Sequence, residues 1–312
     1  SSLIKYPHFA TFALHRDTPM DSITYINRKT GKLITEKPPG EGLLKFLYYH
    51  PLGELALRLV VKRKLISSLY GRIKNSRKST KDIAQFVADL GIDMSEAEKP
   101  IHAFTSFNDF FYRKLKPEAR PIGEDLVSPA DAKLLAFKNA EAVGEFFVKG
   151  ERFTLAKFLQ NEELAEKHKN SALLIFRLAP NDYHRYHFPY AGTTSKSTKI
   201  KGRYFSVSPY ALAPNFTRVF CENKREYMTL TTANKGDILL SPVGATMVGT
   251  IIETYTPNTL VEKGDEMGYF AFGGSTVVML VDPQHFTIDA DLLKNTKNGI
   301  ETAVVMGEKI GK

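Results

Sequence analysis

The chain has 312 residues, of which 43% are hydrophobic and 25% are charged, so it carries enough apolar side chain for the core of one large domain or two smaller ones. Its single cysteine, Cys221, excludes an intrachain disulfide framework and a cluster of cysteine metal ligands. No apolar run approaches the roughly 20 residues of a membrane-spanning helix, and the N-terminus lacks a secretory pattern, so we expect a protein that does not span a bilayer.

The N-terminal third predicts an irregular arm followed by helices. Residues 1–40 contain many turn formers and end at the stretch "EKPPGEG", which is typical of an irregular arm that finishes in a Pro-Gly loop. Residues 41–122 have helical patterns. Within them, "STKDIAQFVADLGID" predicts a helix that is capped by Ser79 or Thr80 and ends at Gly91.

The positive charge of the chain is concentrated in this helical region. The stretch from Leu55 to Lys81 contains no acidic residue, and its basic residues match the formal net charge of +9. Apolar residues alternate with the basic ones, as in amphipathic helices that lie on an anionic membrane surface, although a solvated helix face has the same composition. The basic residues are Arg58, Lys62, Arg63, Lys64, Arg72, Lys74, Arg77, Lys78 and Lys81.

Residues 123–312 predict a β-rich catalytic core. Short apolar or alternating runs, "KLLAF", "ALLIFRL", "YMTLTT", "ATMVGTIIETY" and "TVVMLV", are separated by Gly, Pro, Asn and Asp, as expected of strands joined by turns. A helical insert is expected at "TLAKFLQNEELAEKHK". The predicted fold class is therefore α+β, with a helical, basic N-terminal membrane-docking region on a compact, mostly antiparallel β core.

Three places in the β part carry reactive side chains next to turn signals: Asp131 in "SPADAK", His184 and His187 in "NDYHRYH", and Ser275 in "GGST". Each alone is explained by a turn, a surface pair or a tight entry into a strand. Together they provide the acid, base and hydroxyl of nucleophilic serine chemistry. The strand-to-helix elbow of α/β hydrolases is absent, because Val277 replaces its second glycine and a strand follows.

The two glycines before Ser275 suggest a different use of its hydroxyl. Gly273 and Gly274 leave the serine open access to the carbonyl of its own preceding peptide bond, so it can attack its own backbone. The motifs "FNDFFYRKLKPEARPI", "SPADAK", "YHRYH" and "GGST" occur in an order that resembles the phosphatidylserine decarboxylase family. The resemblance extends over most of the chain.

The resemblance implies a proenzyme that cuts itself between Gly274 and Ser275. His187, oriented by Asp131, deprotonates Ser275, which attacks the Gly274 carbonyl; elimination and loss of ammonia then turn the serine into a pyruvoyl group. The larger β chain and the smaller α chain remain associated. The pyruvoyl carbonyl forms a Schiff base with the substrate amine and accepts the electrons left by CO2, and His184 returns a proton to the product.

The substrate implied by the resemblance is phosphatidylserine, which is converted to phosphatidylethanolamine at an anionic membrane surface. A peripheral protein on the cytoplasmic face of the cell membrane is expected, with no metal and no nucleic-acid partner. Two positions depart from the family pattern: Ala132 stands where glycine is usual after the aspartate, and Gly273 replaces a leucine. If position 132 needs positive φ, alanine strains the turn.

Several alternatives remain open from the residues alone. A pyruvoyl enzyme with another amine substrate, a serine hydrolase, and a non-catalytic lipid- or nucleic-acid-binding protein are each compatible with part of the sequence. Residues 204–225, "YFSVSPYALAPNFTRVFCENKR", are expected to form part of the substrate pocket. The sequence leaves open whether the chain forms a homodimer.

Overall fold

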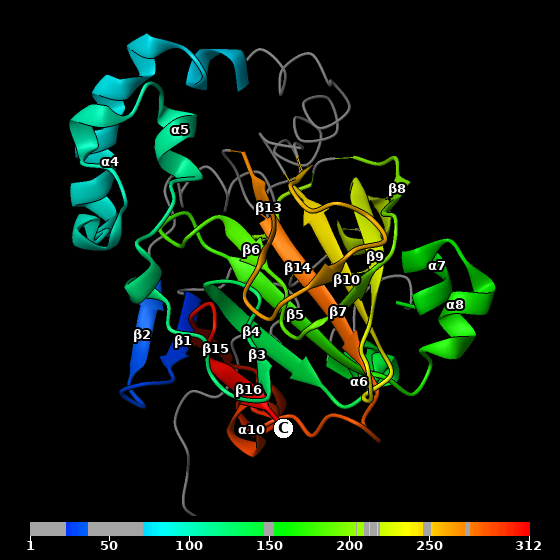
Figure 1. Cartoon of the computed structure of the whole chain (residues 1–312). Helices are drawn as coiled ribbons and strands as arrows, with labels where there is room; N and C mark the ends of the chain where they lie inside the picture. The colour runs from blue at the N-terminus through cyan, green and yellow to red at the C-terminus, as the bar shows by residue number, and fades with distance from the viewer. Residues whose placement is uncertain are drawn as a thin grey trace, which may run out of the picture.

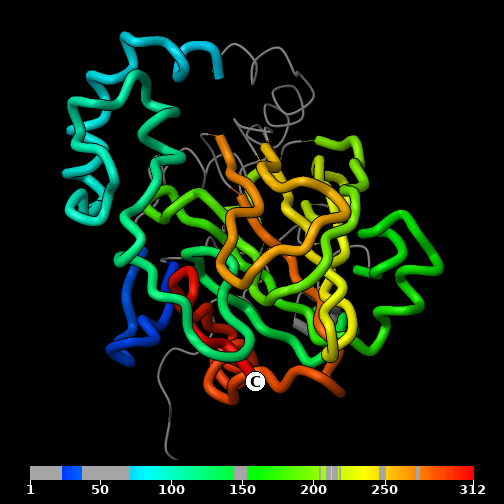
Figure 2. The backbone as a smooth tube through the Cα atoms, in the orientation of Figure 1, coloured from blue at the N-terminus to red at the C-terminus, as the bar shows by residue number. Residues whose placement is uncertain are grey.

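The computed structural model describes residues 23–36, 71–146, 153–203, 205–208, 212, 217, 219–245, 251–271 and 275–312. Figure 1 shows a β-rich body with a small helical part beside it, and Figure 2 traces the same path along the backbone. Three parts of the chain for which the sequence made predictions lie wholly or partly outside the described residues. They are most of the basic stretch 55–81, much of the expected pocket segment 204–225, and Gly274.

The body is built on one large sheet, which has eleven strands among the described residues. Their order is β12-β7-β9-β10-β14-β5-β4-β15-β1-β2, with β8 paired to β9 beside this path. Among the described pairs of this sheet only β1 and β15 run parallel, so the expectation of a mostly antiparallel core is confirmed. The strands are β1 (Ile23–Asn27), β2 (Leu33–Glu36), β4 (Ala132–Phe137), β5 (Ala172–Leu178), β7 (Gly192–Thr194), β8 (Thr198–Ile200), β9 (Arg225–Thr231), β10 (Asp237–Gly244), β12 (Leu260–Val261), β14 (Ser275–Val281) and β15 (Glu301–Val304).

The expected irregular arm contains regular structure. Residues 23–36 form the hairpin β1–β2, which extends the main sheet by pairing β1 with β15 near the C-terminus. In β1 only Ile23 is buried and the next four residues are half-buried, and Gly31, with φ +68°, closes the turn. The prediction of an irregular arm is therefore wrong for residues 23–36. The two short strands were missed because many turn formers flank them.

One face of the main sheet is covered by a second, three-stranded sheet in the order β11-β13-β6. Side chains from both sheets form a single core, in which Tyr186 and Phe270 of the small sheet pack with Phe176 and Val277 of the large one. A two-stranded ladder of β3 and β16 lies at the edge. These strands are β3 (Leu126–Val127), β6 (Arg185–His187), β11 (Ile251–Glu253), β13 (Glu266–Phe270) and β16 (Lys309–Gly311).

The other face of the main sheet is covered by short helices. Phe158 and Leu155 from the predicted helical insert pack on Leu173 and Ile175 of β5, and Val143 joins the same cluster. Because both faces are covered, the central strands β4, β5 and β14 are buried along their whole length, which explains their continuous apolar sequences. The helices on this face are α6 (Ala140–Phe146), α7 (Leu155–Leu159) and α8 (Glu162–Lys167). Helix α10 (Ala290–Lys297), between β14 and β15 in the chain, packs on the opposite face, where Leu292 joins the core between the two sheets.

The described helical part of the N-terminal third is held together by phenylalanines. Phe107, Phe110 and Phe111 pack against Phe104 and Ile83. The aromatic rings of this cluster meet mainly edge to face. The described helical part contains α4 (Ile83–Leu90), α5 (Phe107–Phe111) and the 3-10 helices η1 (Arg77–Asp82), η2 (Met94–Glu96), η3 (Ile101–Ala103) and η4 (Pro117–Ala119).

The caps of α4 were predicted correctly at one end only. Gly91 ends the helix in the left-handed conformation, with φ +62°, as expected. The N-cap is Asp82, without a side-chain cap, and not Ser79 or Thr80. Ser79 makes other hydrogen bonds: its Oγ donates to the Ser76 carbonyl and accepts from the backbone N–H of Phe107. The second of these bonds joins η1 to α5.

A buried charge network shows that the main sheet is strongly curled. Arg177 on β5 pairs with Glu301 on β15 at 2.6 Å and with Glu36 at the end of β2 at 2.7 Å. In a flat sheet four strand spacings, roughly 19 Å, would separate β5 from β2. The N-terminal hairpin therefore folds back toward the central strands.

The structure is a mixed, sheet-rich fold with helices at its periphery. Among the residues described, no helix combines the length and the apolar character that a bilayer crossing requires.

Candidate active site

Ser275 is the first residue of β14 and is completely buried. It lies opposite Leu178 of β5 and Gly244 of β10, so its side chain points to the same face as Leu178. That face is the one covered by β6 and β13. The Oγ atom of Ser275 has no hydrogen-bond partner among the described residues, which is costly for a buried hydroxyl.

His187 ends strand β6 and is anchored at both ring nitrogens. Nδ1 lies 2.9 Å from the carbonyl oxygen of Gly264, and Nε2 lies 3.2 Å from the hydroxyl of Tyr183. Because a carbonyl only accepts, Nδ1 carries the proton and Nε2 is an acceptor for the tyrosine. Burial lowers the pKa of His187, and the Gly264 carbonyl and the charges of Glu266 and Asp131 oppose this shift.

His184 has the same tautomer but an open acceptor. Its Nδ1 lies 2.9 Å from the backbone carbonyl of Asp182, while its Nε2 is buried and has no partner among the described residues. The ring packs on Phe111, with 3.9 Å between centroids. Burial lowers the pKa of His184 from 6.5 to about 3, so the imidazole is neutral at physiological pH.

Asp131 precedes β4 and is bound to the α5–β3 connection. Arg120 approaches its carboxylate with Nη2 at 2.6 Å and Nε at 2.9 Å, and the backbone N–H of Met306 donates to Oδ1 at 2.8 Å. Arg120 also pairs with Glu96 at 3.0 Å. The carboxylate of Asp131 is thus held on several sides by groups other than a histidine.

The resemblance implied that Asp131 orients His187, but among the described residues the ring of His187 is bonded to Tyr183 and Gly264 and not to Asp131. Asp131 and His187 are neighbours nevertheless, because the backbone N–H of His187 donates to the carbonyl of Pro129 at 2.8 Å. The negative charge of Asp131 also reaches the ring electrostatically. The group that orients His187 is the Gly264 carbonyl, which a glycine with φ +91° presents from a tight turn.

An ion pair lies directly behind His184. The Nζ atom of Lys133 on β4 is 2.7 Å from Oδ1 of Asp182, whose carboxylate also accepts the backbone N–H of Ala179. Although burial opposes it, the adjacent carboxylate raises the pKa of Lys133, so the lysine is charged. The pair fixes the backbone carbonyl to which His184 donates.

The substitution of alanine for glycine after Asp131 does not strain the backbone. Ala132 begins β4, opposite Val304 of β15, and is not among the residues with positive φ. Its side chain is buried in the core between the two sheets. The concern that this position needs a left-handed conformation is therefore unfounded.

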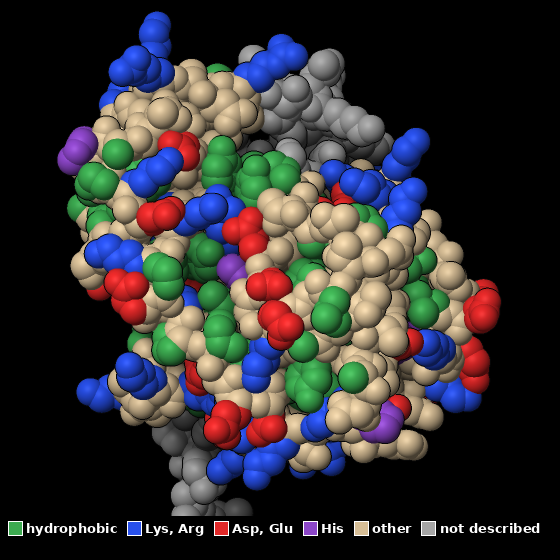
Figure 3. Space-filling model, in the orientation of Figure 1, with side chains coloured by type: hydrophobic (Ala, Val, Ile, Leu, Met, Phe, Trp, Pro, Cys, Tyr) green, Lys and Arg blue, Asp and Glu red, His purple; other side chains and the backbone are tan. Residues whose placement is uncertain are grey.

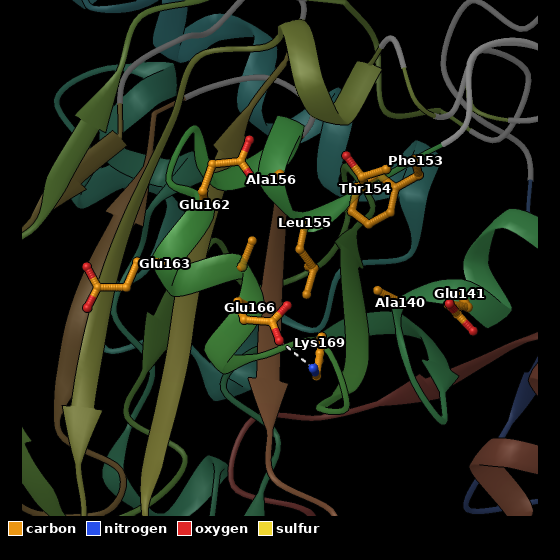
Figure 4. A pocket seen from close by; sticks show the side chains of 11 residues that line it. Ala140, Glu141, Phe153, Thr154, Leu155, Ala156, Glu162, Glu163, Glu166 and Lys169 are labelled. Carbon is orange, nitrogen blue, oxygen red and sulfur yellow. Dashed lines mark hydrogen bonds and ion pairs between the residues drawn. The ribbon is translucent and has the colours of Figure 1, made fainter.

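The hollow shown in Figure 4 is separate from these residues. It has a volume of about 650 Å³ and lies between α6, α7 and α8. Four glutamates line it, but they do not gather at one point. Glu163 and Glu141 lie at opposite sides of the view, and Glu166 pairs with Lys169. None of Asp131, His184, His187 and Ser275 contributes to its wall.

Sequence reasoning missed most of the groups that hold the two histidines and Asp131. Tyr183 and Asp182 stand in the motif "NDYHRYH" and Arg120 in "KPEARPI", so proximity to the motifs was a usable signal. Gly264 and Met306 act through backbone atoms, for which the sequence contains no signal.

The chain is similar to known proteins over most of its length. A family model described as phosphatidylserine decarboxylase matches residues 107–312. A phosphatidylserine decarboxylase proenzyme of Fusobacterium nucleatum is 52% identical over 294 residues, which are 93% of this chain and 98% of the relative. Proenzymes with the same name from Clostridium botulinum and Clostridium tetani are each 46% identical, over 93% of this chain and 99% and 98% of their own.

Both comparisons indicate the same class of enzyme, the decarboxylases. The chain belongs to the phosphatidylserine decarboxylase family.

Proposed function

We propose that this chain is a self-processing decarboxylase that converts phosphatidylserine to phosphatidylethanolamine and CO2, with a pyruvoyl group made from Ser275. One observation carries the proposal in a chain of this family: the buried hydroxyl of Ser275 has no hydrogen-bond partner in the part of the chain that the structure describes, and it points to the face covered by the strand of His187. A hydroxyl kept for structure is normally satisfied.

The surroundings of Ser275 fit a pyruvoyl group. The position of Ser275 is dry, because the serine and its neighbours Leu178 and Val277 are buried. The Nε2 atom of His184 and the Oγ atom of Ser275 are a buried acceptor and a buried donor that have no partner among the described residues. A pyruvoyl carbonyl supplies an electrophile for the substrate amine and a sink for the electrons that CO2 leaves behind.

In the processing step, the Oγ proton passes to a histidine as Oγ bonds to the Gly274 carbonyl carbon. The bond from that carbon to the Ser275 nitrogen breaks, and the nitrogen takes the proton. A base then takes the Cα proton of Ser275 as the Cβ–O ester bond breaks, which releases the Gly274 carboxylate; water hydrolyses the remaining enamine, through its imine tautomer, to the carbonyl and ammonia. His187 is the proposed proton acceptor, since Nε2 carries its lone pair and Asp131 stabilises the resulting imidazolium electrostatically.

In the decarboxylation itself, His184 is the proposed group for proton return to the substrate carbon. Its position is fixed by the Asp182 carbonyl, behind which Lys133 holds the Asp182 carboxylate. Because the buried ring is neutral at physiological pH, it must first take a proton at Nε2 before it can deliver one. The substrate amine, which loses protons as it reacts, is the source we propose.

The membrane-docking role of the N-terminal helices remains part of the proposal. Arg72, Arg77, Lys78 and Lys81 are exposed on the described part of the basic stretch. Basic side chains project from this end of the molecule in Figure 3, and β14 begins toward the same end in Figure 1. This placement favours peripheral docking on an anionic leaflet, with the start of β14 toward the docked side.

The test is intact mass of freshly purified protein under denaturing conditions, beside Ser275→Ala. We expect two fragments from the wild type, of which the smaller begins with a blocked residue of pyruvoyl mass, and CO2 release from phosphatidylserine vesicles. Ser241→Ala is a matched control, because Ser241 is buried on the neighbouring strand but its hydroxyl is satisfied by the Glu226 carbonyl. It should process like the wild type.

The other readings give different results in the same experiment. An uncleaved wild-type chain that reacts with a fluorophosphonate probe would indicate a serine hydrolase. A cleaved chain that releases CO2 from another amine, but not from phosphatidylserine, would keep the chemistry and change the substrate.

A further inference from the structure

A buried arginine near His184 forms no ion pair with any acidic residue in the described part of the chain. Arg113 follows α5 and is 5% exposed, and its guanidinium lies over the ring of Phe110 at 5.2 Å. Its Nε atom is buried without a hydrogen-bond partner, and no ion pair or side-chain hydrogen bond reaches the guanidinium from the described residues. An unpaired buried cation is costly, so its presence calls for an anion other than those of the described residues.

The charges around Arg113 are already taken by other residues. Arg120 binds both Asp131 and Glu96, and Lys133 binds Asp182. The charges of Asp131, Asp182 and Glu96 reach Arg113 electrostatically, although none of them pairs with it. Arg120 and Lys133 thus pair with all three of these carboxylates. The guanidinium of Arg113 is left for a ligand.

The segment of Arg113 lies against the strand of the two histidines. Arg185, the residue after His184, donates from Nε to the Tyr112 carbonyl at 2.9 Å. Phe111 packs on the ring of His184, and the positive charge of Arg113 contributes to the low pKa of His184. The guanidinium is therefore close enough to bind one end of a small molecule that reacts near His184.

We propose that Arg113 binds the phosphodiester of the phospholipid headgroup, an inference that rests on the proposed function. A guanidinium is suited to this task because its planar fork of donors binds phosphate oxygens in pairs. A phosphatidylserine headgroup has two anions, the carboxylate and the phosphodiester. A cation on the carboxylate would stabilise the substrate more than the transition state in which that charge leaves, whereas the phosphodiester keeps its charge throughout the reaction.

This assignment predicts a defect in binding and not in chemistry. In mixed micelles of phosphatidylserine and neutral detergent, Arg113→Gln should raise KM by about tenfold or more and leave kcat within about twofold, since a contact equal in ground and transition states affects KM alone. Lys297→Gln is the matched control, because it removes one positive charge from an exposed position on α10. It should change neither parameter, and each variant is first shown by mass to be fully processed.

A soluble inhibitor separates the two anions of the headgroup. Glycerophosphoethanolamine carries the phosphodiester and lacks the carboxylate, so Arg113→Gln should weaken its competitive inhibition by the same factor as it raises KM. A raised KM with unchanged inhibition would assign Arg113 to the carboxylate and overturn the proposal. A lower kcat at unchanged KM would overturn it as well, because Arg113 would then act on the chemical step.

A second variant covers the case in which Arg113→Gln does not fold or process. Arg113→Lys keeps the charge and loses the paired geometry, so we expect KM and the inhibition constant both to rise by about threefold. Unchanged values would contradict the proposal. If the wild type shows no activity on phosphatidylserine, the proposed function fails; calorimetric binding of glycerophosphoethanolamine to Ser275→Ala, with and without Arg113→Lys, then decides whether the anion site exists.

Discussion

The hydroxyl of Tyr183 occupies the acceptor nitrogen of His187, at 3.2 Å from Nε2. Burial raises the pKa of the Tyr183 phenol, so it remains protonated and remains a donor. The nitrogen that takes the proton of Ser275 in the processing step proposed above is therefore engaged by the tyrosine. Processing requires that the tyrosine gives way or shares this nitrogen.

Tyr183→Phe should accelerate self-cleavage, because Nε2 of His187 loses the donor with which Ser275 competes. A hydrogen bond of about 1 kcal/mol corresponds to an increase of about fivefold. The rate is measured from the appearance of the small fragment after a pulse of cell-free synthesis. Tyr190→Phe, on a half-buried tyrosine packed on Phe286, is the matched control. A slower Tyr183→Phe would show that the phenol assists the reaction.

Arg120→Met should destabilise the chain strongly, because it leaves the buried carboxylate of Asp131 with only the Met306 N–H. Removing one partner of a buried ion pair costs about 3–5 kcal/mol. The free energy of unfolding in urea, measured on the Ser275→Ala background to avoid cleavage, tests this. Arg203→Met, which breaks an exposed pair with Glu222, should cost no more than about 1 kcal/mol. Similar losses for the two variants would contradict the buried role of Arg120.

The low pKa of His184 predicts a loss of stability in acid. The unfolded chain binds a proton as the pH falls through about 6.5, whereas the folded chain does not bind it until about pH 3. The free energy of unfolding should therefore fall between these values by up to about 1.4 kcal/mol per pH unit from this residue, and it should be unaffected above them. His184→Gln removes that slope in urea titrations from pH 8 to pH 4, while His285→Gln on the surface leaves it unchanged.

The sequence predicted the sheet core well, because strands buried on both faces are continuous apolar runs. "ALLIFRL" and "TVVMLV" became β5 and β14, and the insert "TLAKFLQNEELAEKHK" became α7 and α8. The hairpin β1–β2 was missed, since its pairing with β15 is made with a distant part of the chain. Local pattern carries no information about such a partner.

In the site, too, the residue types could be predicted from the local sequence, whereas their hydrogen-bond partners could not. Motif chemistry selected Asp131, His184, His187 and Ser275, and the structure gathers the first three around the strand β6 and the loop before β4. The hydrogen bonds were not predictable: Asp131 is held by Arg120, and His187 by Gly264, 77 residues along the chain. Residue type indicates a possible role, whereas the partner depends on the fold.

The exposed basic residues at the start of the described helical part should contribute to membrane binding. Arg77 and Lys78 both lie on the surface. Replacing both with glutamine should weaken binding to vesicles rich in phosphatidylserine by roughly 30-fold, since each basic residue near an anionic surface is worth about 1 kcal/mol. Sedimentation with vesicles at low salt measures this, and the difference should shrink at high salt.

The control for this charge change is the double variant Lys294→Gln and Lys297→Gln on α10, which removes the same charge from another exposed surface. If binding depends only on the net charge of the protein, both double variants lose affinity equally, and the helical part has no special role in docking. A loss confined to Arg77 and Lys78 places the docking surface on the helical part, beside the end of the molecule at which β14 begins. Binding to vesicles of neutral lipid should be weak and equal for all three proteins, because the attraction depends on the anionic headgroups.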